Sequence, residues 1–105
     1  MEEKTKINWA FSALEMLAEI HEYISEKSEK SADKYIDGIY DSIKKLESHP
    51  ESCAPCRNSK LREKGYRCCK FKSHIIIYQF IENMVDILAV IHLKRNPTDI
   101  EEILK

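Results

Sequence analysis

Apolar residues recur along the first half of the chain with the spacing of two amphipathic helices. The first set is separated by four, three and four residues and comprises Ala13, Leu17, Ile20 and Ile24. The second is separated by four, three, four and three residues and comprises Ala32, Ile36, Ile39, Ile43 and Leu46. Each set forms one stripe of a helix, and Pro50 ends the second because the residue before a proline avoids helical dihedral angles. With the polar segment 25–31 between them, the two stripes predict an antiparallel helical hairpin.

The helix ends carry capping and charge signals. Ser12 and Glu15 have the spacing of a capping box, which predicts that Ser12 caps the first helix. Asp33 falls in the first turn of the second helix and Lys44 in its last turn, where each complements the helix dipole. Thr98 begins a second capping box, which predicts a short C-terminal helix.

The second half of the chain has the short, strongly apolar runs of β-strands. The predicted strands are Leu61–Lys64, Tyr66–Phe71, His74–Ile81 and Met84–Leu93, preceded by a first strand within Lys4–Trp9. Two-residue breaks at 72–73 and 82–83 fit hairpin turns. The predicted fold class is therefore α+β, in a single domain over residues 1–105: an N-terminal strand and an antiparallel helical hairpin packed on an antiparallel β-sheet, with a short C-terminal helix.

Composition limits the class and the location of the protein. The 105 residues are 43% hydrophobic and include only two glycines and three prolines, which argues against disorder. No run of 18 apolar residues is present, so we expect no transmembrane helix. The acidic start at Glu2 and Glu3 lacks the apolar segment of a secretory signal. We therefore expect a cytoplasmic protein with no membrane partner.

The charges are distributed unevenly, although the net charge is only −1. Residues 1–51 carry 12 acidic and seven basic side chains, whereas residues 52–105 carry six acidic and ten basic ones. Seven of the basic residues lie between positions 57 and 72: Arg57, Lys60, Arg62, Lys64, Arg67, Lys70 and Lys72. Such a run is either a solvated strand face or a surface for an anionic or acidic partner, and the neighbouring Tyr66, Phe71 and Tyr78 keep the second interpretation open.

Four cysteines occur as Cys53-x-x-Cys56 and the adjacent Cys68 and Cys69. Adjacent residues on a strand point to opposite faces, so these two cannot easily bind one metal ion. His49 and His74 could complete a site, but nothing in the spacing requires one. We expect no bound metal and no cofactor, with one cysteine buried and the others as reduced surface thiols.

Several aromatic residues and histidines have structural explanations. Trp9 and Phe11 are expected in the core, and Tyr66 and Tyr78 in or near it. His92 closes an apolar strand, where a hydrogen-bonded strand-end histidine is the simplest interpretation.

The order of these motifs resembles the RelE/ParE superfamily of type II toxin–antitoxin toxins over nearly the whole chain. The motifs are a strand ending near Trp9, a helix ending at Tyr23-Ile24, and a second helix ending at His49-Pro50. Those closest to the ParE branch are Leu61-Arg62 with Gly65-Tyr66-Arg67, Ser73 to Tyr78, and Ile91-His92 followed by Arg95-Asn96.

The resemblance implies one of two activities. ParE-like toxins inhibit DNA gyrase by binding it and are not enzymes. RelE-like toxins cut mRNA on the ribosome, which requires acid–base groups and cations. For that alternative the candidate catalytic residues are Arg62, Arg67, Lys70 and His92. Leu93 stands where a His-Tyr pair needs tyrosine, so the chain departs from the nuclease pattern.

We therefore expect a ParE-like toxin that is neutralised by a cognate antitoxin and inhibits gyrase. The candidate target-binding residues are Arg62, Lys64, Arg67, His74, Tyr78 and His92. The resemblance implies no direct sequence-specific DNA binding by this chain. A third hypothesis is a degenerate toxin that only binds its antitoxin.

Overall fold

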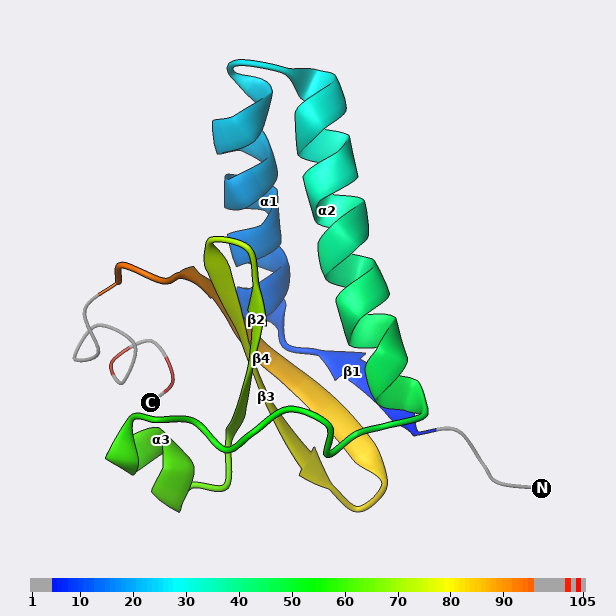
Figure 1. Ribbon diagram of the computed structural model, residues 1–105, viewed down its shortest axis with the longest axis vertical. Coiled ribbons are helices and arrows are strands. Elements are labelled where there is room, and N and C mark those ends of the chain that lie inside the picture. The colour runs from blue at the N-terminus through cyan, green and yellow to red at the C-terminus, as the bar shows by residue number, and fades with distance from the viewer. Residues whose placement is uncertain (1–4, 96–101, 103, 105) are drawn as a thin grey trace.

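The computed structural model describes residues 5–95, 102 and 104. Figure 1 shows two long helices standing beside a small twisted sheet. In chain order the elements are β1 (Lys6–Trp9), α1 (Phe11–Ser25), α2 (Glu29–Lys44), a 3₁₀ turn (Lys45–Glu47), α3 (Ser59–Glu63), β2 (Arg67–Phe71), β3 (His74–Ile81) and β4 (Met84–His92). The predicted α+β fold class is confirmed.

The helical hairpin forms where the apolar stripes predicted it. A three-residue connection joins α1 to α2, and the hydroxyl of Ser28 accepts a hydrogen bond from the Ser31 backbone N–H at 3.1 Å, which caps α2. The predicted capping box at Ser12 is wrong. The cap position of α1 is Ala10, whose backbone N–H donates to the Ile87 carbonyl at 2.9 Å, and the Ser12 hydroxyl donates to the Leu88 carbonyl instead. The sheet therefore fixes where α1 begins.

The sheet has the strand order β1-β4-β3-β2. Strands β2, β3 and β4 are antiparallel neighbours, as predicted, but β1 runs parallel to β4, so the sheet is mixed. Positive φ angles at Lys72, Glu82 and Asn83 form the two tight turns, at the predicted breaks. The two middle strands, β3 and β4, contain the longest apolar runs, and their central residues are buried on both faces.

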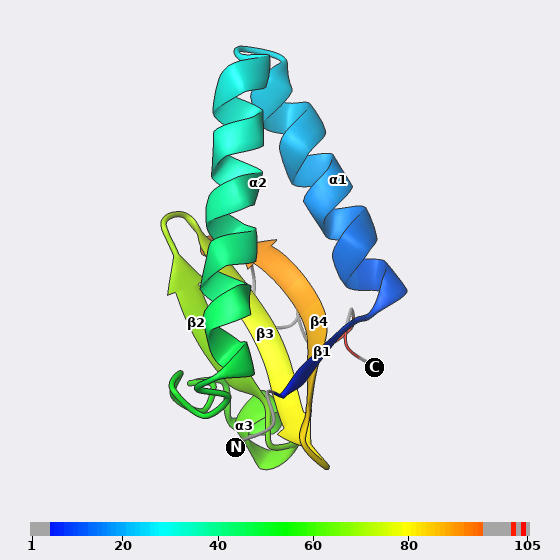
Figure 2. The ribbon, with the colours of Figure 1, turned by 90° about the vertical axis from the view of Figure 1, so that its right-hand side faces the viewer.

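The main core lies between the helical hairpin and one face of the sheet (Figure 2). Helix α1 packs on β4 and α2 on β2, and Tyr78, Ile39 and Ile76 are fully buried between them. Gly38 allows the Phe71 ring to reach the α2 backbone, since a Cβ at this position would collide with the ring. Phe11 was predicted to be buried, but 75% of it is exposed at the first position of α1.

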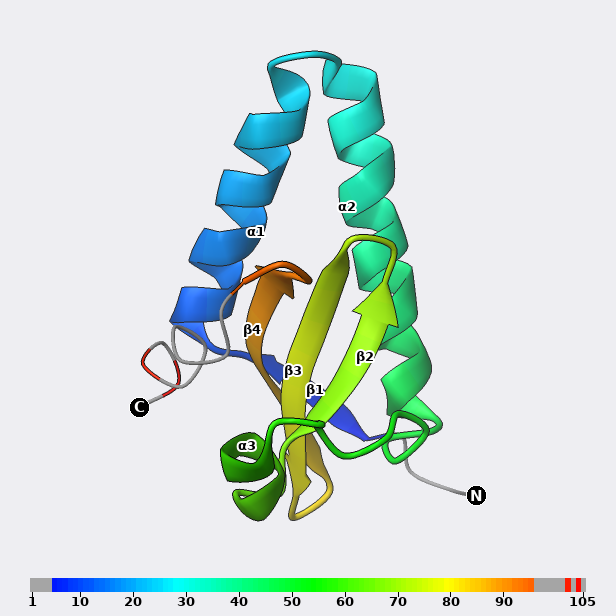
Figure 3. The ribbon, with the colours of Figure 1, turned by 60° about the vertical axis from the view of Figure 1, so that its left-hand side comes forward.

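On the other face of the sheet, α3 and the loop before it cover one end of β2 and β3 (Figure 3). Here Cys56, Leu61, Ile77, Ala89 and Ile91 form a second buried cluster. The predicted strand Leu61–Lys64 is wrong, because the side chain of Asn58 caps a short helix by accepting from the N–H groups of Lys60 and Leu61 at 3.0 and 3.1 Å. The predicted C-terminal helix from Thr98 lies outside the described residues.

Two disulfides join this loop to β2, and they overturn the expectation of reduced thiols. Cys53 is paired with Cys69 and Cys56 with Cys68, with Cα–Cα distances of 5.4 and 5.0 Å. The loop runs along the outer edge of β2, where Cys68 N–H donates to the Ala54 carbonyl and Cys56 N–H to the Tyr66 carbonyl, each at 3.1 Å. Since Cys68 and Cys69 point to opposite faces, the loop presents one cysteine on each side of the strand.

Candidate functional site

The six predicted target-binding residues do not form one site. Arg62 and Lys64 lie on and just after α3, and both are exposed. His74 and His92 face each other at the far end of β3 and β4. Arg67 and Tyr78 are register partners between these two groups.

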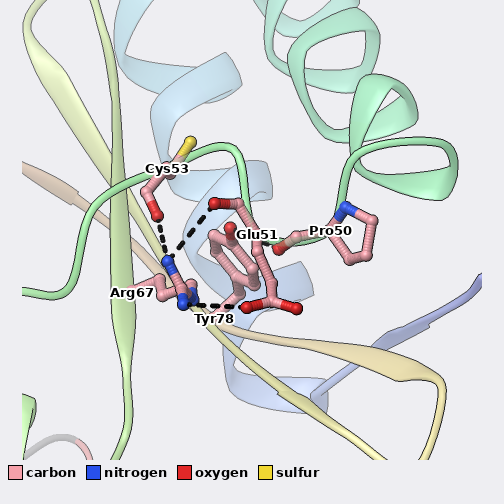
Figure 4. A network of polar contacts seen from close by, with 5 residues as sticks. All are labelled: Pro50, Glu51, Cys53, Arg67 and Tyr78. Carbon is pink, nitrogen blue, oxygen red and sulfur yellow. Dashed lines mark hydrogen bonds and ion pairs between the residues drawn. The ribbon is translucent and has the colours of Figure 1, made fainter.

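Arg67 and Tyr78 hold the loop rather than face a partner (Figure 4). The Arg67 guanidinium donates to the Cys53 carbonyl at 2.7 Å and to the Glu51 carbonyl at 3.3 Å, and pairs with the Glu51 carboxylate at 3.4 Å. The Tyr78 hydroxyl donates to the Pro50 carbonyl at 2.8 Å, and the side chain is completely buried, which raises its pKa. Tyr78 is therefore a core residue, as one of the two sequence interpretations held, and is inaccessible to a target.

A groove with a basic rim lies on the α3 face, and we call it the α3 groove. Its volume is about 470 Å³. Its apolar floor includes Leu61, Ile75 and Ile91, while Arg57 and Lys70 stand at its edge. Arg62 lies next to this edge, since its guanidinium donates to the Arg57 carbonyl at 3.4 Å, and Lys64 is exposed just after α3. An apolar floor inside a cationic rim is suited to an acidic protein surface.

A second groove lies between α1 and the end of the sheet, and we call it the hairpin groove. Its volume is about 440 Å³. Met16, Ile20 and Tyr23 line it from α1, and Val90 lines it from β4. Tyr23 is 75% exposed, an unusual state for a large apolar side chain that continues a buried stripe.

The two histidines close one end of the hairpin groove. Their ring centroids are 5.2 Å apart and their planes are nearly perpendicular. His74 Nδ1 lies 2.7 Å from the Tyr35 hydroxyl, and the Lys94 backbone N–H donates to His92 Nδ1 at 3.1 Å. Burial and the nearby His92 lower the pKa of His74. The prediction of a hydrogen-bonded strand-end histidine at His92 is confirmed.

Sequence analysis missed Tyr35 and Arg95, which also line the hairpin groove. The sequence does contain a signal for this groove. Met16 and Tyr23 lie beside the apolar stripe of α1, so the apolar surface of this helix is wider than packing against the sheet alone requires.

The candidate nuclease residues do not converge. Lys70 and His92 project from opposite faces of the sheet, because Lys70 pairs with Ile75 whereas His92 pairs with His74, one residue earlier on β3. Arg67 lies at the other end of β2, roughly 13 Å along the strand from the His74–His92 pair. These residues therefore cannot all contact one RNA phosphate in a transition state.

Within residues 5–95, 102 and 104, no three His, Cys, Asp or Glu side chains are grouped so that they could hold a metal ion. His74 is bonded to Tyr35, and the four cysteines are paired with one another. Among the same residues, no helix is long and apolar enough to cross a bilayer.

Comparison with known proteins defines the class. The family model for the ParE toxin of the type II toxin–antitoxin system parDE matches residues 7–97. The chain therefore belongs to the ParE toxin family, and it is a ParE-like type II toxin.

A solved structure described as the chromosomal ParDE toxin–antitoxin system from P. aeruginosa has the same fold, with a TM-score of 0.73. It is 15% identical, and the alignment covers 89% of this chain and 100% of that one. A search of curated proteins finds no match.

Proposed function

We propose that this toxin inhibits DNA gyrase by binding it, through the basic surface beside α3. The proposal requires a cytoplasmic location, because gyrase acts on the chromosome. A cognate antitoxin neutralises the toxin, and the chain needs no cofactor for this role.

The separation of the candidate nuclease residues carries this choice. With Lys70 and His92 on opposite faces of the sheet, the candidate nuclease residues do not bring their acid–base group next to Lys70, and RNA cleavage requires an acid–base group and cations around one phosphate. Inhibition by binding needs only a surface of suitable shape and charge. The α3 groove, with Arg57 and Lys70 at its edge and Arg62 and Lys64 nearby, supplies such a surface.

The hairpin groove is proposed as the antitoxin site. Its wall of Met16, Ile20 and Tyr23 suits the apolar face of an amphipathic segment, and Arg95 at its end favours an acidic one. The gyrase and antitoxin surfaces then lie on opposite faces of the sheet.

Charge reversal tests the gyrase assignment. Arg62→Glu combined with Lys64→Glu should weaken inhibition of gyrase supercoiling in vitro by at least about tenfold, because like charges then face the acidic target. Lys27→Glu combined with Lys30→Glu is the matched control, since it makes the same charge change at exposed positions at the tip of the hairpin. The control should inhibit gyrase as the unmodified protein does.

Three other results would contradict the proposal. Equal loss in both variants would show only a net-charge effect. Cleavage of mRNA at the ribosome, with gyrase unaffected, would establish the endonuclease alternative. Antitoxin binding without either activity would identify a degenerate toxin.

A further inference from the structure

The hydrogen bonds of the two groove histidines indicate which ring nitrogen carries the proton. The Lys94 backbone N–H donates to His92 Nδ1, so this nitrogen is unprotonated and Nε2 carries the hydrogen. Burial raises the pKa of the Tyr35 hydroxyl, so this group keeps its proton and donates it to His74 Nδ1, which lies 2.7 Å away. His74 Nε2 therefore also carries a hydrogen.

Two N–H donors consequently stand side by side at the end of an apolar groove. Both imidazoles line the hairpin groove, and their ring centroids are 5.2 Å apart. Arg95 lines the same end, immediately after the turn that follows β4. Neither ring offers a lone pair to a metal ion in this state, because Nδ1 accepts a hydrogen bond and Nε2 is protonated. The arrangement presents donors alone, which is what a carboxylate requires.

We infer that the histidine end of the hairpin groove is a carboxylate-binding site for one acidic side chain of the antitoxin. His74 Nε2–H and His92 Nε2–H donate to the carboxylate oxygens, and the Arg95 guanidinium adds a charge-assisted hydrogen bond. The inference rests on the proposed function, in which the antitoxin binds in this groove. It adds which part of the bound antitoxin segment lies at which end of the groove. An apolar face packs on Met16, Ile20 and Tyr23, and an acidic residue follows it at the sheet end.

The neighbouring charges are compatible with this assignment. The Lys72 ammonium lies 5.7 Å from the centroid of the Tyr35 ring, which places a second cation near the histidines. Glu19 lines the groove on α1, the same helix as the apolar wall. A segment with its acid at the histidine end is therefore favoured over one with its acid along α1.

A double-mutant cycle tests the site. The probe is a synthetic peptide with the sequence of the C-terminal segment of the cognate antitoxin, and its affinity is measured by calorimetry. His92→Phe keeps a ring but removes the donor, and Arg95→Gln removes the charge. Each should weaken binding about tenfold, the usual effect of losing a hydrogen bond to a charged group. His92→Gln should recover part of the loss, because its amide N–H can still donate.

The peptide supplies the other half of the cycle. One acidic residue changed to its amide should weaken binding as much as His92→Phe does, and the two changes together should cost no more than either one. The ring Nε2 resonances of His74 and His92 should shift on addition of the acidic peptide and much less with the amide peptide. Arg57→Gln on the α3 face is the matched control for Arg95→Gln, and it should bind normally.

The outcomes separate this inference from the proposed function. If Ile20→Asp abolishes binding while His92→Phe and Arg95→Gln leave it unchanged, the carboxylate site is wrong and the antitoxin groove stands. If the peptide fails to bind, or binds Ile20→Asp as tightly as the unmodified chain, both are wrong. Circular dichroism melts confirm that each variant is folded.

Discussion

The two ends of the β2–β3 hairpin are built in different ways. At one end, which we call the stapled end, two disulfides and the Arg67 and Tyr78 hydrogen bonds fasten the loop of residues 50–58 to the sheet. At the other, the open end, Tyr23 remains largely exposed over the hairpin groove. The same small sheet is thus closed at one end and left unfilled at the other.

Mutations at the two ends should therefore have different effects, on stability at the stapled end and on binding at the open end. Side chains at the stapled end satisfy one another, so changing them should lower the free energy of unfolding. Tyr23 and Arg95 at the open end are exposed, so changing them should alter binding while the fold persists.

The same substitution at two tyrosines should separate the ends most clearly. Tyr78→Ala removes a fully buried ring and leaves a cavity, and should cost about 3–5 kcal/mol of unfolding free energy. Tyr23→Ala removes a side chain that is 75% exposed, and should change stability by less than about 0.5 kcal/mol. Urea denaturation of the two variants measures both values. Comparable losses would show that the open end also supports the fold.

The two disulfides should act as one cross-link. They span 16 and 12 residues and are nested, so once one pair is closed, the other constrains little additional chain. Replacing either pair by alanine should therefore cost much less than replacing both, which should lose about 3 kcal/mol of loop-closure stabilisation. Thermal melts of the three variants, under oxidising conditions, measure the values.

The reducing agent dithiothreitol provides an independent check. It should lower the melting temperature of the unmodified chain and leave that of the four-alanine variant unchanged. Strictly additive losses from the two pairs would contradict the single-cross-link account. The cytoplasm, the proposed location of the toxin, is reducing and favours thiols. The decrease in melting temperature on reduction therefore shows how stable the toxin is with its cysteines reduced.

Sequence reasoning succeeded where the signal was periodic and long. The apolar stripes of α1 and α2 extend over several turns, and the apolar run of β3 is bounded by turn residues, so the predicted strand His74–Ile81 has the observed bounds. Such patterns reflect burial over many residues, which few alternative structures can satisfy.

The structure of the stapled end was not predicted, because the local sequence there is compatible with more than one structure. Helix α3 has five residues, too few to show a helical period, and Leu61 alone anchors it. The cysteine pairing depends on the loop running beside β2, and four cysteines allow three pairings from sequence alone. Both interpretations of the basic run at 57–72 treat its side chains as solvent-facing, yet the Arg67 guanidinium donates to the Cys53 and Glu51 carbonyls of the loop.

A pair of arginines provides the next comparison. Arg67→Gln removes hydrogen bonds to the loop and should cost about 1–2 kcal/mol of unfolding free energy. Arg62→Gln changes an exposed residue and should leave stability within about 0.5 kcal/mol. In gyrase inhibition the order should reverse, with Arg62→Gln the more harmful at temperatures where both variants are folded. If Arg67→Gln weakens gyrase inhibition by more than its loss of folded protein explains, Arg67 contacts the target directly and this account of Arg67 is wrong.

The smallest effect concerns pH at the open end. Burial and His92 lower the pKa of His74 below its ordinary value of 6.5, so the unfolded chain binds a proton at this residue more readily than the folded chain. The His74 contribution to stability is therefore fully present above pH 6.5, and it is lost as the pH falls toward the lowered pKa.

Protonation also removes the acceptor for the Tyr35 hydroxyl and places charge beside His92, Lys72 and Arg95, with Glu19 the acidic group that lines the same groove. The test is the unfolding free energy of the unmodified chain minus that of His74→Gln, measured from pH 8 to pH 5. This difference should be constant above pH 6.5 and should decrease below it, since other titrating groups cancel between the two proteins. A difference that rises on acidification would mean that His74 gains a proton more easily in the folded chain, and that the groove already attracts positive charge before any acidic segment is bound.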